Sequence, residues 1–189
     1  MSDTVHRLTP AWNLDGNYPY RYVDSRDGTF EIEEFDKTEP LANEWTEPAL
    51  QVIQDGEMSD VCYCATGYFL FNERARDHLA ELVGSHAEWL PAKVDERRLW
   101  IPHPLVSVAL SGEAEVDCSA IGGNITAINR YAFARPPEDL PPVFFIANPP
   151  DSAAGKAGHA TQGIYVTSSI ATVLAERSIT GIRAIQVPL

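Results

Sequence analysis

The chain has 189 residues, of which 44% are hydrophobic and 10% aromatic, and this composition suffices for one globular domain with a sizeable core. Its formal net charge of −13 disfavours binding to nucleic acid or to an anionic membrane and favours a basic partner. No apolar run approaches the roughly 20 residues of a membrane-spanning helix, and no basic segment followed by an apolar one marks a signal peptide, so we expect a cytoplasmic protein.

Residues 1–57 are predicted to form an acidic region of loops and short strands. The first 20 residues have the composition of an extended lead-in, without a helical period. Short strands are expected at 20–23, 30–35 and 49–53, because apolar and polar residues alternate there in part and turn-forming residues lie between them.

A helix predicted at residues 72–83 is the clearest local signal. Its apolar residues recur with the helical period and are expected to form one buried stripe: Ala75, Leu79, Leu82 and Val83. Asn72 is a good N-cap, and Gly84 is a natural stop. Residues 62–65 and 68–71 are expected to form one bent strand or two short strands that lead into this helix.

Strands are expected along most of the remaining chain. They are predicted at 92–94, 97–101, 104–110, 124–133, 143–147, 164–166 and 179–187. Pro102 and Pro104 indicate an edge or a bend, because proline has no N–H for a sheet ladder. Residues 117–119 are expected to begin a turn, and the Pro/Gly/Ala/Ser-rich residues 148–162 are expected to form a mobile loop.

These elements predict an α+β fold with a mainly antiparallel sheet and two principal amphipathic helices, at about 72–83 and 168–178. One face of the second helix carries Ile170, Val173 and Leu174. The acidic N-terminal region, 1–57, and an α+β core, 58–189, are expected to form one compact domain.

The sequence contains no recognisable catalytic or metal-binding motif. Phosphate-loop and nucleophile-elbow patterns are absent. The three cysteines, Cys62, Cys64 and Cys118, are an odd number without zinc-ligand spacing, so we expect them to be reduced and packed. His78 is expected beside the packed helix face and His86 in a turn. We therefore expect no metal, no cofactor and no catalytic residue.

Clustered carboxylates leave an enzymatic alternative open. Glu113, Glu115 and Asp117 alternate along the chain, and a small acidic hydrolase would need such groups to converge in one pocket. Alternating acids on a strand more often form its solvated face. A scaffold component of a bacterial assembly is a further alternative.

Three segments carry a resemblance to a known family. They are Met58-Ser-Asp60 with the following strand, helix and Trp89-Leu-Pro91, then Val116-Asp-Cys-Ser119 with its following strand, then 143–146, 164–169 and 179–182. In this order they resemble the eleventh immunity-protein family of bacterial polymorphic toxin systems, over roughly residues 45–189. The chain departs from the family pattern where 143–148 lacks an arginine and where Thr167 replaces a serine.

The resemblance implies a non-enzymatic cytoplasmic protein that binds and neutralises a cognate secreted antibacterial toxin. Many such toxins are nucleases, which need a basic surface to bind phosphate, and an acidic inhibitor is suited to cover that surface. Electrostatic attraction would also speed capture of the toxin. Neither nucleic acid nor a membrane is an expected partner.

The acidic residues are concentrated where a partner surface is expected. Residues 1–60 hold 14 acidic and 4 basic residues, a net of −10, whereas residues 61–189 have a net of −3. Solubility alone is a competing explanation of this acidity. Trp45, flanked by acids, is a candidate interface anchor because tryptophan is frequent in binding hot spots. The predicted partner-binding residues are Glu31, Glu33, Glu34, Asp36, Glu44, Trp45, Glu47, Asp55 and Glu57.

Overall fold

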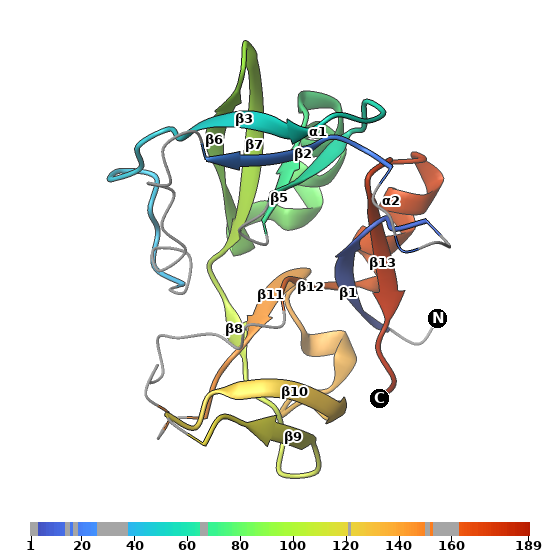
Figure 1. The fold of residues 1–189 in the computed structure, drawn as a ribbon. Coiled ribbons are helices and arrows are strands. Elements are labelled where there is room, and N and C mark those ends of the chain that lie inside the picture. The colour runs from blue at the N-terminus through green and yellow to red at the C-terminus, as the bar shows by residue number, and fades with distance from the viewer. Residues whose placement is uncertain are drawn as a thin grey trace.

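Three sheets and two α-helices make up the described part of the chain (Figure 1). The computed structural model describes residues 4–13, 16, 19–25, 38–64, 68–120, 122–149, 152 and 163–189. The prediction of an α+β fold with mainly antiparallel strands and two principal helices is confirmed. No helix in these ranges is long and apolar enough to cross a membrane.

A closed six-stranded barrel forms one end of the molecule (Figure 1). Its strands, in spatial order, are β2 (Tyr22–Ser25), β3 (Ala49–Gln54), β6 (Ala87–Val94), β7 (Arg97–Pro104), β5 (Phe69–Phe71) and β4 (Val61–Cys64). Its core includes Val23, Leu50, Cys64, Leu70, Leu90, Ala92, Val94, Leu99 and Ile101. Successive side chains alternate between the inside and the outside of the barrel, so each strand contributes every second residue to this core.

A five-stranded sheet forms the second layer. Its order is β13 (Ile182–Gln186), β1 (Val5–Pro10), β12 (Tyr165–Thr167), β11 (Val143–Ile146) and β8 (Ser107–Val108), and only the β11–β8 pair is parallel. Phe144 and Ile146 pack on the face shared with Tyr131, whereas Val143 and Phe145 join the core shared with both helices. The two-stranded sheet of β9 (Glu115–Cys118) and β10 (Ile125–Arg130) lies at the far end from the barrel (Figure 1).

The helices are α1 (Glu73–Val83) and α2 (Ser168–Glu176), and short 3-10 turns are η2 (Gly84–His86) and η3 (Pro137–Asp139). The Asn72 cap is confirmed, because its Oδ1 accepts a hydrogen bond from the Ala75 N–H at 2.8 Å. Leu79 is buried, but Leu82 is 38% exposed, so its predicted place in the buried stripe is wrong. The stripe that meets the core consists of Ala75, Leu79 and Val83, which lie at i, i+4 and i+8.

Several strands differ from the sequence prediction. The lead-in contains β1, and residues 117 and 118 lie in β9 rather than in a turn. The strand predicted at 92–94 begins at Ala87, and β7 continues through Pro102 to Pro104. The predicted strand 30–35 and most of the loop 148–162 lie outside the described residues. Strands from the first 57 residues pair with later strands in both large sheets.

Candidate functional site

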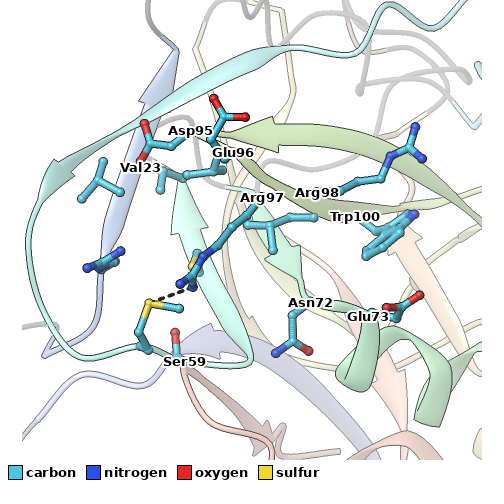
Figure 2. A pocket seen from close by; sticks show the side chains of 15 residues that line it. Val23, Ser59, Asn72, Glu73, Asp95, Glu96, Arg97, Arg98 and Trp100 are labelled. Carbon is cyan, nitrogen blue, oxygen red and sulfur yellow. Dashed lines mark hydrogen bonds between the residues drawn. The ribbon is translucent and has the colours of Figure 1, made fainter.

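A pocket with a volume of about 560 Å³ lies at the open end of the barrel (Figure 2). Its floor is apolar and consists of side chains that belong to the barrel core or pack against it: Val23, Val52, Cys62, Val94 and Leu99. Arg21, Arg97 and Met58 line the pocket above this floor. The mouth of a barrel is a common binding site, because the inward-facing side chains of the strands do not fill the space at its end.

Arg21 and Arg97 both line the pocket at the barrel mouth. The Arg97 side chain extends across the pocket in Figure 2, and its Nη1 donates to the Met58 Sδ at 3.0 Å. A thioether is a weak acceptor. Among the residues that the structure describes, Arg97 has no carboxylate partner, whereas Arg21 pairs with Asp55 at 3.3 Å.

Cys62 shares the pocket with these arginines. Burial raises the pKa of its thiol, and a hydrogen bond with Ser59 and the charges of Arg21 and Arg97 only partly oppose that shift. A raised pKa favours the neutral thiol over the nucleophilic thiolate at pH 7. The prediction of reduced, packed cysteines is confirmed for Cys62 and Cys64, but Cys118 is exposed.

Three of the predicted acidic residues that the structure describes pair with or adjoin residues that line this pocket, although none of them lines it. Glu47 pairs with Arg98 at 3.6 Å, and Asp55 pairs with Arg21. Glu57 directly precedes Met58, and its backbone oxygen accepts from the Arg21 N–H at 3.2 Å. These three acids and Glu44 are exposed. Predicted residues 31, 33, 34 and 36 lie outside the described ranges.

Trp45 lies on the barrel rather than on an open surface. Its indole N–H donates to the Pro91 oxygen at 2.7 Å, and its ring packs against the barrel core. Nearby, the Glu88 carboxylate accepts from the Leu41 N–H at 2.6 Å and lies 2.9 Å from the Nδ1 of the fully buried His103. The segment around Trp45 is therefore hydrogen-bonded to β6. The role of Trp45 as an interface anchor stays a prediction.

Asp60 joins segments that are far apart in the sequence. Its carboxylate accepts from the Thr180 N–H at 3.0 Å and from Asn72 Nδ2 at 3.1 Å, and it pairs with Arg74 at 2.8 Å. Burial by itself would raise the pKa of Asp60, but these hydrogen bonds, together with that from the Thr180 hydroxyl, hold it below its usual value. No model of a known protein family matches the chain, and no curated protein matches its sequence.

The lowered pKa of Asp60 predicts a pH-dependent contribution to stability. Asp60→Asn is expected to lower the free energy of unfolding by about 1 to 3 kcal/mol near neutral pH, because charge-assisted hydrogen bonds are lost. The carboxylate stabilises the fold above its unfolded pKa, about 3.8, and this contribution is lost as the pH falls through the folded pKa.

Urea unfolding of both proteins between about pH 7 and pH 3 measures this dependence, and the difference between them is expected to shrink toward the acidic end. Asp77→Asn, at an exposed ion pair with Arg76, is the matched control and is expected to change stability by less than about 1 kcal/mol. A pH-independent difference would contradict the proposed role of the Asp60 charge.

The carboxylates of the enzymatic alternative do not converge: Glu113 lines a pocket with Ser111 and Tyr131, but Glu115 and Asp117 do not line that pocket. Glu113, Glu115 and Asp117 are exposed. Glu115 pairs with Arg130 at 3.0 Å, and Asp117 accepts from Asn129 at 3.2 Å. Within the described ranges, no group of three or more His, Cys, Asp or Glu side chains is placed to hold a metal ion.

Sequence reasoning missed Arg97 and His103. His103 carried no signal, since nothing local distinguishes a buried histidine in a strand from an exposed one. For Arg97, the available signal was the pair Arg97-Arg98 behind the acidic turn at Asp95 and Glu96. A β-hairpin tip at the end of a barrel would have placed that pair at the rim, but the barrel itself was not predicted.

Proposed function

We propose that this protein is a cytoplasmic immunity protein that binds a cognate secreted antibacterial toxin and blocks its action. The observation that carries the proposal is that three exposed acids each pair with or adjoin a residue that lines the pocket at the barrel mouth: Glu47 pairs with Arg98, Asp55 pairs with Arg21, and Glu57 precedes Met58. The sequence resemblance independently implies the same activity. Both lines of support concern binding of a protein partner rather than conversion of a substrate.

The chemistry of the barrel mouth suits a basic protein partner. Exposed carboxylates around an apolar depression resemble the polar rim and central pocket of tight interfaces. Fixed like charges on one surface cost self-repulsion in the free protein, and a basic partner removes that cost. The same charges attract the toxin before contact, which raises the rate of association.

Neutralising the charges of Glu47, Asp55 and Glu57 tests this proposal. The triple variant Glu47→Gln, Asp55→Asn, Glu57→Gln is expected to weaken protection of cells that co-express the toxin encoded beside this gene. The matched control, Glu113→Gln, Glu138→Gln, Glu176→Gln, changes the net charge equally at exposed positions away from the pocket and is expected to protect like the wild type. Thermal melts of both variants report whether folding is retained.

Binding kinetics provide the second readout. The association rate of the wild type with its toxin is expected to fall several-fold between about 50 and 150 mM salt, whereas dissociation changes less. Equal protection by the two triple variants, together with a salt-insensitive association rate, would show that the acidity serves only solubility. The absence of a neighbouring toxin gene would count against the immunity function itself.

A further inference from the structure

We propose that the barrel-mouth pocket binds a small aliphatic carboxylate, whose anionic group pairs with Arg97 and whose apolar body lies on the barrel core. This inference concerns the interior of the pocket. It does not depend on the toxin partner, which the proposed function places at Glu47, Asp55 and Glu57. It rests on the position of one guanidinium, on the apolar floor beneath it and on the size of the cavity.

Arg97 is the first part of the argument. Six of the 11 lysines and arginines that the structure describes pair with a carboxylate, as the neighbouring Arg98 does with Glu47 at 3.6 Å. Among the described residues, Arg97 makes its hydrogen bond to the Met58 sulfur instead. Most of its N–H donors therefore remain available, and their planar fork matches the two oxygens of a carboxylate.

The floor defines the rest of the ligand. The half-buried Val52 and Cys62, with the small exposed parts of Val94 and Leu99, present apolar surface at the base of the pocket. A sugar phosphate would place hydroxyl groups against this surface without hydrogen-bond partners, which is costly. The lining also includes Glu73, Asp95 and Glu96, but they lie at the edges of the pocket in Figure 2, whereas a cationic ligand on the floor would meet Arg97, which extends across it. An aliphatic chain that ends in a carboxylate satisfies both the floor and the guanidinium.

The cavity volume of about 560 Å³ falls within the range of pockets that bind small molecules, roughly 300 to 1,000 Å³. The acidic side chains of Asp95 and Glu96 belong to the turn between β6 and β7, and Figure 2 shows them on the opposite side of the pocket from Ser59. The Arg97 side chain lies between these two sides, over the floor. An anion entering the pocket therefore meets the guanidinium directly.

Isothermal titration of the full chain with octanoate tests the proposal. We expect saturable binding, with octanol and octylamine each binding at least roughly tenfold more weakly because they lack the anionic group. Arg97→Gln is expected to weaken octanoate binding roughly tenfold or more, and Arg97→Lys, which keeps the charge without the fork, to have an intermediate effect. Arg130→Gln, on β10, is the charge-matched control and is expected to bind like the wild type.

A measurement on the wild-type protein guards against a folding defect in the variant. The Arg97 Nε–H resonance, identified by its loss in Arg97→Gln, is expected to shift as octanoate is added. A peptide C-terminus carries the same group, but the polar amide of N-acetyl-leucine would meet the apolar floor, so it is expected to bind more weakly than octanoate.

Four outcomes would overturn the proposal. They are an absence of octanoate binding up to about 10 mM, equal binding of octanol or octylamine, unchanged binding by Arg97→Gln, and tighter binding of N-acetyl-leucine. The last would assign the pocket to a polypeptide C-terminus. None of these outcomes bears on toxin protection, so this inference and the proposed function can fail separately.

Discussion

Replacement of Leu79 by alanine is expected to lower the free energy of unfolding by about 2 to 5 kcal/mol. The side chain is 3% exposed and belongs to the core that α1 shares with α2, the barrel strands and the five-stranded sheet. Truncation removes buried apolar surface and leaves a cavity that elements fixed on several sides cannot easily close. Urea unfolding measures the loss, and the thermal midpoint should fall by roughly 2 to 4 °C per kcal/mol.

Leu82→Ala provides the matched control, because it makes the same chemical change three positions along the same helix. With 38% of Leu82 exposed, the expected loss is below about 1 kcal/mol. Comparable losses for the two variants would mean that the buried face of α1 has been assigned wrongly.

Gly181→Ala is expected to cost about 3 kcal/mol or more. Gly181 has a φ of +88°, which an L-residue adopts only with strain. A Cβ there would also collide with the Val61 backbone oxygen and approach the Ser59 side chain to 2.9 Å. Since Gly181 follows Thr180, which bonds to Asp60, the chain cannot shift without disturbing that connection.

Gly112→Ala tests whether this effect belongs to the position rather than to the residue type. A Cβ at Gly112 has no neighbour within 4 Å, so the variant is expected to be neutral or slightly stabilised. Chemical unfolding of both variants gives the comparison. A Gly181→Ala protein as stable as the wild type would show that β4 and the start of β13 are more loosely packed than described.

Local signals predicted α1 well because its determinants lie within the helix. The Asn72 cap, the Gly84 stop and the spacing of Ala75, Leu79 and Val83 are all readable in the sequence. Leu82 failed because it lies at the margin of the apolar stripe. Whether such a residue is covered depends on the neighbouring elements, which the helix sequence does not specify.

The prediction that the strand ends at residue 101, before Pro102, was wrong, because β7 continues through this proline. Pro91 pairs with Trp100, and Pro102 pairs with Trp89, so both fall on alternate rungs of the hairpin. On these rungs the backbone groups point away from the partner strand, as the Trp45 bond to the Pro91 oxygen illustrates. A missing N–H is therefore harmless there. Pairing register, rather than local composition, decides whether proline is tolerated.

The strand β1 was missed for a related reason. Val5 packs in the core beneath β9 and β10, whereas Leu8 packs on the opposite face with the helices. A strand covered on both faces shows no simple alternation of apolar and polar residues. Of the candidate site, the sequence indicated only acidic residues nearby, because charge is visible in composition, whereas the pocket requires residues from five strands to be brought together.

The position of β1 also constrains how the chain can be made. β1 lies between β12 and β13, which are among the last strands to leave the ribosome. At synthesis rates of about 5 to 20 residues per second, the N-terminal strand waits on the order of ten seconds or more before either neighbour exists. During that time its backbone groups and the side chain of Val5 are open to other chains. The nascent protein is therefore expected to depend on chaperones more than its native stability would suggest.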